Sequence, residues 1–263
     1  MIANPVQTKP LVAATDIAKS YSRIEALSPM SFSIRPGERV ALAGPSGSGK
    51  TTLLNLLSGM LQPDSGKLCI GDQDLSRLMP GQELSRLVGL IHQQYDLVPQ
   101  LPVLHNVLAG RLGQWSLFRS LVSLVWPRDR QLAETALAQL GIEDKIHERT
   151  SHLSGGEQQR VAIARVMIQS PQLVLADEPV ASLDPARAEE MLRLLTDLTA
   201  NSGKTLVASL HSPYLIQKYF SRVIGLREGR IQFDRPTAEV TESVLDDLYD
   251  LDQLHWEVGS EVS

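Results

Sequence analysis

One segment of the sequence, GPSGSGKT at residues 44–51, has residue types and spacing that could bind phosphate. It matches the pattern G-x-x-x-x-G-K-[ST], in which glycines let backbone N–H groups turn toward phosphate oxygens. Lys50 would reach the β- and γ-phosphates, and the Thr51 hydroxyl would bind Mg²⁺. The alternative is a glycine-rich turn capped by Ser48. The segment lies between an expected strand and an expected helix, whose N-terminal dipole favours anions, and it therefore predicts a nucleoside triphosphate site.

A second segment, LVLADEP at residues 173–179, places two carboxylates after an apolar strand. Strands that are buried on both faces deliver their carboxyl ends to the ligand crevice of an open α/β sheet. Asp177 would join the Mg²⁺ shell there, and Glu178 would polarise the attacking water as a general base. A polar turn closed by Pro179 is the alternative, but the phosphate-binding pattern in the same chain favours the catalytic interpretation.

A third segment, LSGGEQQR at residues 153–160, precedes a helical pattern. Ser154 and Glu157 have the spacing of a capping box, which any helix can use. Gly155 and Gly156 are unusual in a first turn, since each costs about 1 kcal/mol relative to alanine in a helix interior. They are explained if a ligand approaches the backbone closely. The serine hydroxyl and the N–H groups would then form a second anion site, and both interpretations stay open.

Short apolar strands alternate with helical patterns along the chain, which is typical of a wound α/β fold. The strands are expected at residues 11–17, 26–34, 39–43, 87–92, 173–176, 205–210 and 223–226. The helices are expected at residues 50–58, 131–140, 157–169 and 185–199. Residues 94–151 show no strand pattern and are predicted to form a mainly helical insert.

Composition narrows the class of protein further. Of the 263 residues, 43% are hydrophobic and 21% charged, which is ordinary for a globular protein with a full core. The net charge of −5 argues against a general nucleic-acid-binding protein. Cys69 is the single cysteine, which excludes an intramolecular disulfide and a cysteine-rich zinc site. No apolar run approaches the roughly 20 residues that span a bilayer, and residues 1–10 lack a signal-peptide pattern, so a cytosolic protein is expected.

The phosphate loop, the LSGGEQQR segment and the two carboxylates together resemble the nucleotide-binding subunit of ATP-binding-cassette (ABC) transporters. The resemblance covers residues 11–249. It implies an α/β fold of the ABC ATPase type, in which a P-loop NTPase (RecA-like) core carries an antiparallel β subdomain and a helical subdomain. Residues 1–263 would form one such domain, with the core at 11–92 and 160–250 and the helical subdomain at 93–159.

The resemblance also implies roles for single residues. Glu178, His211 and Gln93 would be catalytic, with His211 at the γ-phosphate and Gln93 reaching Mg²⁺ and the attacking water. The metal ligands would be Thr51, Gln93 and Asp177. The residues that would contact ATP are Tyr21, Gly44, Pro45, Ser46, Gly47, Ser48, Gly49, Lys50, Thr51, Thr52, Ser154, Gly155, Gly156 and Asp184.

Several of these residues have a plainer interpretation without the resemblance. Tyr21 is an ordinary strand-end tyrosine, where the resemblance implies a ring stacked on adenine. Asp184 before a proline is a standard N-cap, where the resemblance implies a loop that crosses a dimer interface. His211 is a polar turn residue, and Gln94 is the alternative to Gln93.

The resemblance further implies partners. Two copies of the chain would pair head to tail, so that Ser154 and Gly156 of one copy meet the γ-phosphate held by the other. The subunit would dock peripherally on a membrane permease, at the cytoplasmic face of the inner membrane, and a solute-binding protein would act indirectly. The segments that are similar to phosphonate-import ATPases, and that imply phosphonate, phosphite or hypophosphite as cargo, are residues 108–113, 115–121, 176–185 and 244–249.

Other functions stay open at this point. One alternative is an ABC ATPase of a non-import motor, of the lipoprotein-release or cell-division type, and another is an importer of a different small solute. A GTPase is disfavoured because no N-K-x-D segment occurs. Residues 115–126 place apolar and polar side chains on opposite faces at helical spacing, which fits packing inside the insert or a groove for a short permease helix.

Overall fold

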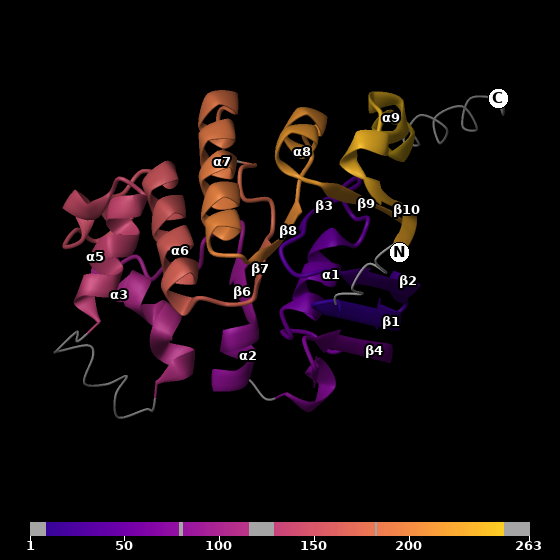
Figure 1. The fold of residues 1–263 in the computed structure, drawn as a ribbon, viewed down its shortest axis with the longest axis horizontal. Coiled ribbons are helices and arrows are strands. Elements are labelled where there is room, and N and C mark those ends of the chain that lie inside the picture. Colours follow the sequence, from indigo (N-terminus) through magenta and orange to yellow (C-terminus); the bar gives the residue numbers. More distant parts are fainter. Residues whose placement is uncertain (1–8, 79–80, 116–128, 182, 250–263) are drawn as a thin grey trace, which may run out of the picture.

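The computed structural model describes residues 9–78, 81–115, 129–181 and 183–249, which form two β-sheets with helices around them (Figure 1). The first sheet is antiparallel, with the order β2 (Ile24–Ile34), β1 (Val12–Tyr21), β4 (Ser65–Ile70) and β5 (Gln73–Asp74). Exposed and buried side chains alternate along the second half of β2. This period of two is expected for a strand with one face on a core and the other toward solvent.

The second sheet carries the candidate chemistry. Its order is β10 (Arg230–Pro236), β9 (Arg222–Arg227), β3 (Arg39–Ala43), β8 (Thr205–Ser209), β7 (Leu173–Ala176) and β6 (Val88–Ile91). β10 is antiparallel to β9, and the other five strands are mutually parallel. Their carboxyl ends therefore meet at one edge, where open α/β sheets bind ligands.

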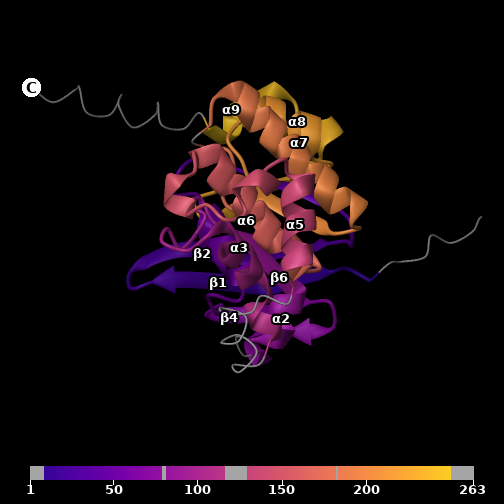
Figure 2. The same ribbon diagram turned by 90° about the vertical axis from the view of Figure 1, so that its left-hand side faces the viewer.

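The helices cover both faces of the second sheet. They are α1 (Lys50–Leu57), α2 (Gln82–Leu87), α3 (Val103–Leu108), α5 (Arg130–Gln139), α6 (Gly155–Gln169), α7 (Pro185–Asn201), α8 (Pro213–Tyr219) and α9 (Glu242–Tyr249). Figure 2 shows α7, α8 and α9 at the opposite side of the molecule from α2 and β4. In Figure 1, α3, α5 and α6 gather beyond β6, away from the antiparallel sheet.

Side chains of the second sheet alternate between two hydrophobic cores. Leu173 and Leu175 of β7 pack into the core shared with α1 and the antiparallel sheet. Val174 and Ala176 of the same strand pack into the core formed with α6 and α7. A strand buried on both faces is apolar throughout, which explains the uninterrupted run that ends at the carboxylates.

The wound α/β arrangement predicted from the alternation of patterns is observed. β7 and β3 have the expected bounds, and the other expected strands and helices occur with their ends displaced. Where residues 94–151 are described, they form helices and 3₁₀ turns without a strand, as predicted. The predicted amphipathic segment covers residues 115–126. Only Trp115 of this segment belongs to the described residues. The division into a core and a helical subdomain stays a prediction.

Candidate nucleotide-binding site

The phosphate-binding pattern occupies the turn between β3 and α1, and its backbone requires glycine at two positions. Gly44 has a φ of 148°, and a Cβ there would lie 2.0 Å from the carbonyl oxygen of Leu226 in β9. Gly49 has a φ of 102°, and a Cβ there would lie 2.8 Å from the carbonyl oxygen of Ala26 in β2. L side chains rarely adopt either conformation. The loop is thus fixed against β9 where it begins and against β2 where it ends.

The ammonium group of Lys50 is folded back into this loop. Lys50 is 5% exposed and donates hydrogen bonds to the carbonyl oxygens of Gly44, at 2.7 Å, and Pro45, at 2.9 Å. Burial lowers the pKa of Lys50, and the negative charges of Glu178 and Asp177 oppose that shift. A buried cation whose short hydrogen bonds go to neutral carbonyls gains strongly from an anion that enters the loop.

The rest of the loop leaves the start of α1 accessible to an anion. The N-cap of α1 is Gly49, and the helix has no side-chain cap. The alternative interpretation, a turn capped by Ser48, is therefore wrong. Ser46, Gly47 and Thr51 are exposed, and Thr52 is half-buried.

Asp177 and Glu178 follow β7 directly and are tied together by Ser209, the last residue of β8. The Ser209 hydroxyl donates to Asp177 Oδ1 at 2.7 Å and accepts the backbone N–H of Glu178 at 2.7 Å. Glu178 has a φ of 47°, which is uncommon for a residue other than glycine. Ser209 is 0% exposed and holds this backbone conformation in place. The sequence analysis missed Ser209, although a lone hydroxyl that ends an apolar strand beside the acidic strand is a usable signal.

The carboxylate of Glu178 lies between two of the other predicted catalytic side chains. His211 Nε2 is 2.8 Å from Glu178 Oε1, and Gln93 Nε2 donates to Glu178 Oε2 at 3.4 Å. The three residues follow β7, β8 and β6, which are neighbouring strands, so the parallel sheet brings them together. Glu178 and His211 also line a cavity of about 390 Å³ between α7 and α8. The carboxylate is thus oriented by neighbours and open to water, as a general base requires.

His211 is followed by α8, which the sequence analysis did not predict. Ser212 is the N-cap of α8 and accepts the N–H of Leu215, and Pro213 occupies the first turn. Because α8 begins directly after His211, the helix start fixes the backbone that carries the imidazole. The Ser212-Pro213 pair is an ordinary helix start.

The LSGGEQQR segment forms the capping box that the spacing predicts. The Ser154 hydroxyl accepts the N–H of Glu157 at 3.4 Å, and Glu157 accepts the N–H of Ser154 at 2.8 Å. The Ser154 hydroxyl also donates to Glu157 Oε2 at 2.7 Å, and this bond, together with the one from the Ser154 N–H, lowers the pKa of Glu157. A Cβ at Gly155 or Gly156 would meet no atom within 4 Å. Packing among the described residues therefore does not require these glycines, and the close approach of a ligand to them stays a prediction.

The buried face of α6 contacts the two loops that hold Gln93 and Glu178. Arg165 donates to the carbonyl oxygens of Tyr95 and Asp96, both at 2.7 Å, and these residues have φ values of 59° and 46°. Burial lowers the pKa of Arg165, and the Asp96 carboxylate opposes that shift. The Gln159 side chain donates to the carbonyl oxygen of Pro179. The sequence analysis missed both contacts, although an arginine inside the apolar run VAIARVMI is the visible signal for the first.

Two predicted site residues show only their plainer roles within one chain. Asp184 caps α7 by accepting the N–H of Arg187 at 3.1 Å, with Pro185 in the first turn. Tyr21 ends β1, is 44% exposed, and has the Lys19 ammonium 6.0 Å from its ring centroid. The exposed ring is accessible to a flat ligand, and its adenine contact stays a prediction.

The two predicted anion sites are apart within one chain. In Figure 1, α1 lies on one side of β6 and β7, and α6 lies on the other. The phosphate loop at the start of α1 and the glycines at the start of α6 therefore do not form one pocket within a single copy of the chain. A shared phosphate would need a second copy.

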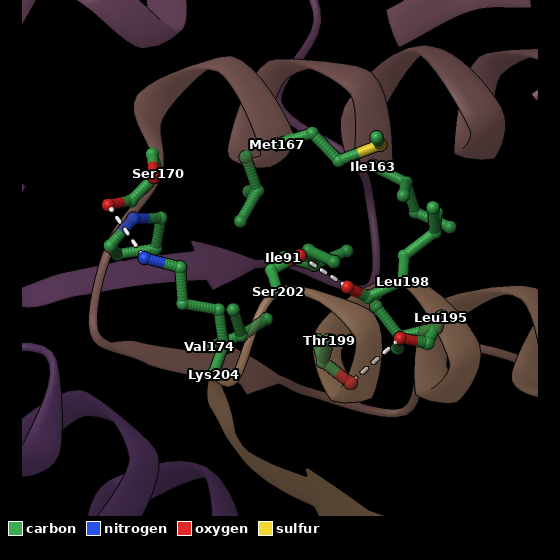
Figure 3. A pocket seen from close by; sticks show the side chains of 12 residues that line it. Ile91, Ile163, Met167, Ser170, Val174, Leu195, Leu198, Thr199, Ser202 and Lys204 are labelled. Carbon is green, nitrogen blue, oxygen red and sulfur yellow. Dashed lines mark hydrogen bonds between the residues drawn. The ribbon is translucent and has the colours of Figure 1, made fainter. Parts of the chain in front are cut away.

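A smaller cavity, of about 100 Å³, lies between α6 and α7 and is shown in Figure 3. Its polar side chains are satisfied locally, since Thr199 donates to the Leu195 carbonyl at 2.9 Å and Lys204 to the Ser170 carbonyl at 3.5 Å. None of the predicted site residues lines this cavity. It is an apolar packing feature behind β7 and does not contribute to the nucleotide site.

This fold and this site define a P-loop nucleoside triphosphatase. The ABC transporter family model matches residues 27–181, more than half of the 263 residues. The chain belongs to the ABC transporter family, as the sequence analysis predicted. In the four described ranges, no helix combines the length and the apolar character needed to cross a membrane.

Curated relatives and solved structures agree with this assignment. The phosphonates import ATP-binding protein PhnC 1 of Pseudomonas aeruginosa is 48% identical over 237 residues, 89% of each chain. PhnC of Pseudomonas putida is 46% identical over 236 residues, 89% of this chain and 88% of that protein. PhnC of Anaeromyxobacter dehalogenans is 46% identical over 92% of this chain, which spans about half (48%) of that relative.

Solved structures extend the comparison to the fold. The dimeric ATP-binding cassette MJ0796 bound to ADP and Pi has a TM-score of 0.72 and 30% identity, over 86% of this chain and 98% of that chain. The ADP conformation of the cassette MJ1267 has a TM-score of 0.77 and 25% identity, over 96% of this chain and 100% of that chain. The predicted fold class is confirmed.

Proposed function

We propose that this chain is the ATP-hydrolysing subunit of an ABC importer that takes up phosphonates. The observation that carries the hydrolytic assignment is the position of Glu178 between Gln93 and His211, at the sheet edge that also holds the phosphate loop. The import class and the cargo are supported by relatives at 43–48% identity that are named phosphonates import ATP-binding proteins. Phosphite and hypophosphite are chemically close alternatives for the cargo.

In the proposed site, residues 44–52 bind the triphosphate, and Lys50 exchanges its carbonyl partners for phosphate oxygens. Glu178 accepts a proton from the attacking water, while Gln93 and His211 hold its carboxylate in position. His211 additionally contacts the γ-phosphate.

Magnesium fits the oxygen donors at this edge. Asp177 is fixed through Oδ1 by Ser209, and a carboxylate, a hydroxyl and an amide oxygen are ligands that Mg²⁺ prefers. Asp177, Thr51 and Gln93 would hold the ion, which when bound neutralises charge on the phosphate oxygens. Among the described residues, no cluster of three or more histidine, cysteine or acidic side chains forms a metal site by itself.

Two copies of the chain would enclose two ATP molecules head to tail. The separation of α1 from α6 and the open space beside Gly155 and Gly156 support this arrangement. The dimeric state of the related cassette MJ0796 supports it as well. Ser154 and Gly156 of one copy would contact the γ-phosphate bound by the other, and Asp184 would lie at the interface. Tyr21 would stack on adenine.

The remaining partners follow from the import assignment. The subunit would dock peripherally on a membrane permease at the cytoplasmic face of the inner membrane, and a solute-binding protein would deliver the cargo from the other side. The domain would comprise residues 1–263, with the core at 11–92 and 160–250 and the helical subdomain at 93–159.

The general-base assignment is tested with Glu178→Gln. The variant should bind ATP and dimerise, while ATP turnover falls by about 100-fold or more, since a positioned base contributes roughly 10²–10⁴-fold. Glu189→Gln is a matched control, because Glu189 lines the same cavity but pairs with Lys218. That control should keep turnover within about twofold. Wild-type turnover in Glu178→Gln would remove Glu178 from the proposed chemistry.

The cargo is tested in liposomes that contain the chain, its co-purified permease and the solute-binding protein. Methylphosphonate, phosphite, phosphate and an amino acid are added separately, and ATP turnover is measured. Stimulation by phosphonate or phosphite alone supports the proposal. Stimulation by the amino acid alone or by phosphate alone would show that the cargo is not a phosphonate. No stimulation by any of them would favour a motor without cargo.

A further inference from the structure

The last described helix, α9, reaches the phosphate loop from the far end of the chain. Leu245 and Leu248 are 0% and 4% exposed, and they fix α9 in the core that it shares with β9. Tyr249 ends this helix, and its ring packs against the same core. The Tyr249 hydroxyl accepts the backbone N–H of Gly44 at 3.2 Å. The first residue of the phosphate loop is thus bonded to a side chain 205 positions later.

Gly44 is held at both of its main-chain polar groups. Its N–H donates to Tyr249, and its carbonyl oxygen accepts the Lys50 ammonium at 2.7 Å. Gly44 is buried, and the carbonyl of Leu226 lies against its Cα. A rotation of the Gly44 peptide would therefore move the lysine partner and the loop together. Tyr249, Gly44 and Lys50 form one continuous line of contacts from α9 into the site.

Burial raises the pKa of Tyr249, while the hydrogen bond from Gly44 opposes that shift. The phenol therefore stays protonated near neutral pH and acts as a neutral acceptor. Phenylalanine in its place would keep the ring but would leave the buried Gly44 N–H without its acceptor.

We propose that Tyr249 is a positioning residue for nucleotide binding, which presets the start of the phosphate loop from α9. The inference rests on the proposed role of residues 44–52. It concerns a part of the chain beyond residues 27–181, which match the family model. Tyr249 contacts the loop backbone and has no contact with Glu178, Gln93 or His211 among the described interactions. Its loss should therefore weaken binding of phosphate groups and spare the hydrolytic step.

The test is Tyr249→Phe in the full-length chain. Isothermal titration should show ADP and a non-hydrolysable ATP analogue binding about 5- to 20-fold more weakly, the range expected when a buried N–H loses its acceptor. KM for ATP should rise by a similar factor, and kcat at saturating ATP should stay within about twofold. The affinity for inorganic tripolyphosphate should fall by the same factor as that for the ATP analogue, because Tyr249 acts on the phosphate loop and not on the part of the site that binds adenine.

Tyr219→Phe is the matched control. Tyr219 is also a largely buried tyrosine, on α8, and its hydroxyl interacts with Glu189 instead of the loop. The control should bind nucleotide like the wild type, and both variants should melt within a few degrees of it. Wild-type affinity in Tyr249→Phe, or a fall in kcat without a change in KM, would overturn the inference. Lys50→Ala tests the proposed function separately from the role of Tyr249. If nucleotide binding survived in Lys50→Ala, residues 44–52 would not be the nucleotide site.

Discussion

Removing the hydroxyl of Ser209 should slow ATP hydrolysis, because this hydroxyl positions the two carboxylates that follow β7. Ser209 is 0% exposed, and its Oγ makes two hydrogen bonds of 2.7 Å, one to the Asp177 carboxylate and one from the Glu178 N–H. In Ser209→Ala, a buried N–H and a carboxylate oxygen both lose a partner. A neutral hydrogen bond contributes about 1 kcal/mol and one to a charged group about 1.5–3 kcal/mol, so the free energy of unfolding should fall by about 2–4 kcal/mol.

Part of this loss should be expressed in catalysis. The left-handed backbone of Glu178, with its φ of 47°, costs about 1–2 kcal/mol relative to ordinary conformations. Without the Ser209 bond the backbone is free to relax, and the carboxylate then leaves its position between Gln93 and His211. At about 1.4 kcal/mol per tenfold in rate, kcat should fall by about 5- to 30-fold. KM for ATP should stay within about twofold, because no contact of the phosphate loop changes.

The assay compares kcat, KM and urea unfolding of Ser209→Ala with those of Thr205→Val. Thr205 begins the same strand, is 1% exposed, and accepts the N–H of Gly37 at 2.8 Å, far from the carboxylates. Thr205→Val removes one neutral hydrogen bond, so it should lower the free energy of unfolding by about 1 kcal/mol and keep kcat. If Ser209→Ala kept the kcat of the wild type, or if Thr205→Val lost as much, the argument that Ser209 orients Glu178 would be refuted.

Two further predictions concern α6. Arg165→Lys should lower kcat by about tenfold with little change in KM, since the compact lysine ammonium lacks the planar fork of N–H donors with which the guanidinium holds the Tyr95 and Asp96 carbonyls together, and one lost charged hydrogen bond corresponds to about 1.5–3 kcal/mol. Steady-state ATP turnover checks this, and unchanged kcat would contradict it. Glu157→Gln keeps the capping geometry but removes the negative charge of the carboxylate. Because hydrogen bonds from Ser154 lower the pKa of Glu157 in the folded chain, the wild type should be more stable than this variant near pH 7. That advantage should be lost as the pH falls from the usual glutamate pKa of 4.5 through the lowered pKa of Glu157, and urea unfolding near pH 7 and below that lowered pKa measures it.

Patterns along the chain predicted the elements that are buried or locally encoded. β7 is apolar at every position because both of its faces are covered, and its predicted bounds are the observed ones. The start of α6 was visible because a capping box is a contact between residues three apart. The β4 and β5 strands were missed, since β4 exposes its first three residues, SGK, and β5 has only two residues. β4 is held by pairing with β1, and the edge strand β5 by pairing with β4, so both strands carry little pattern of their own.

In the candidate site, too, the locally encoded residues were predicted and those that depend on distant contacts were missed. Lys50 and the glycines of its loop are encoded within eight residues, so their spacing alone indicated phosphate binding. Ser209 and Arg165 act through contacts with residues 31 or more positions away, so a polar side chain in an apolar run marks each residue but does not identify its partner. The loop that follows Gln93 is an example. The φ values of Tyr95 and Asp96 depend on the Arg165 guanidinium, which comes from α6 and is far away in the sequence.

One helix connects the surface offered to a second chain with the residues that surround the attacking water. Ser154 caps α6 at its exposed start, and Arg165 binds the Gln93 loop about three turns further along, some 16 Å at 1.5 Å per residue. Gln159, between them, bonds the carbonyl that follows Glu178. Because the interior of a helix does not stretch, in the proposed head-to-tail dimer a phosphate on the other copy that displaced the start of α6 would also move both loops. The capping box and Arg165 therefore lie near the two ends of one stiff helix. A variant at either end should change the same quantity, the position of Gln93 and Glu178 relative to each other.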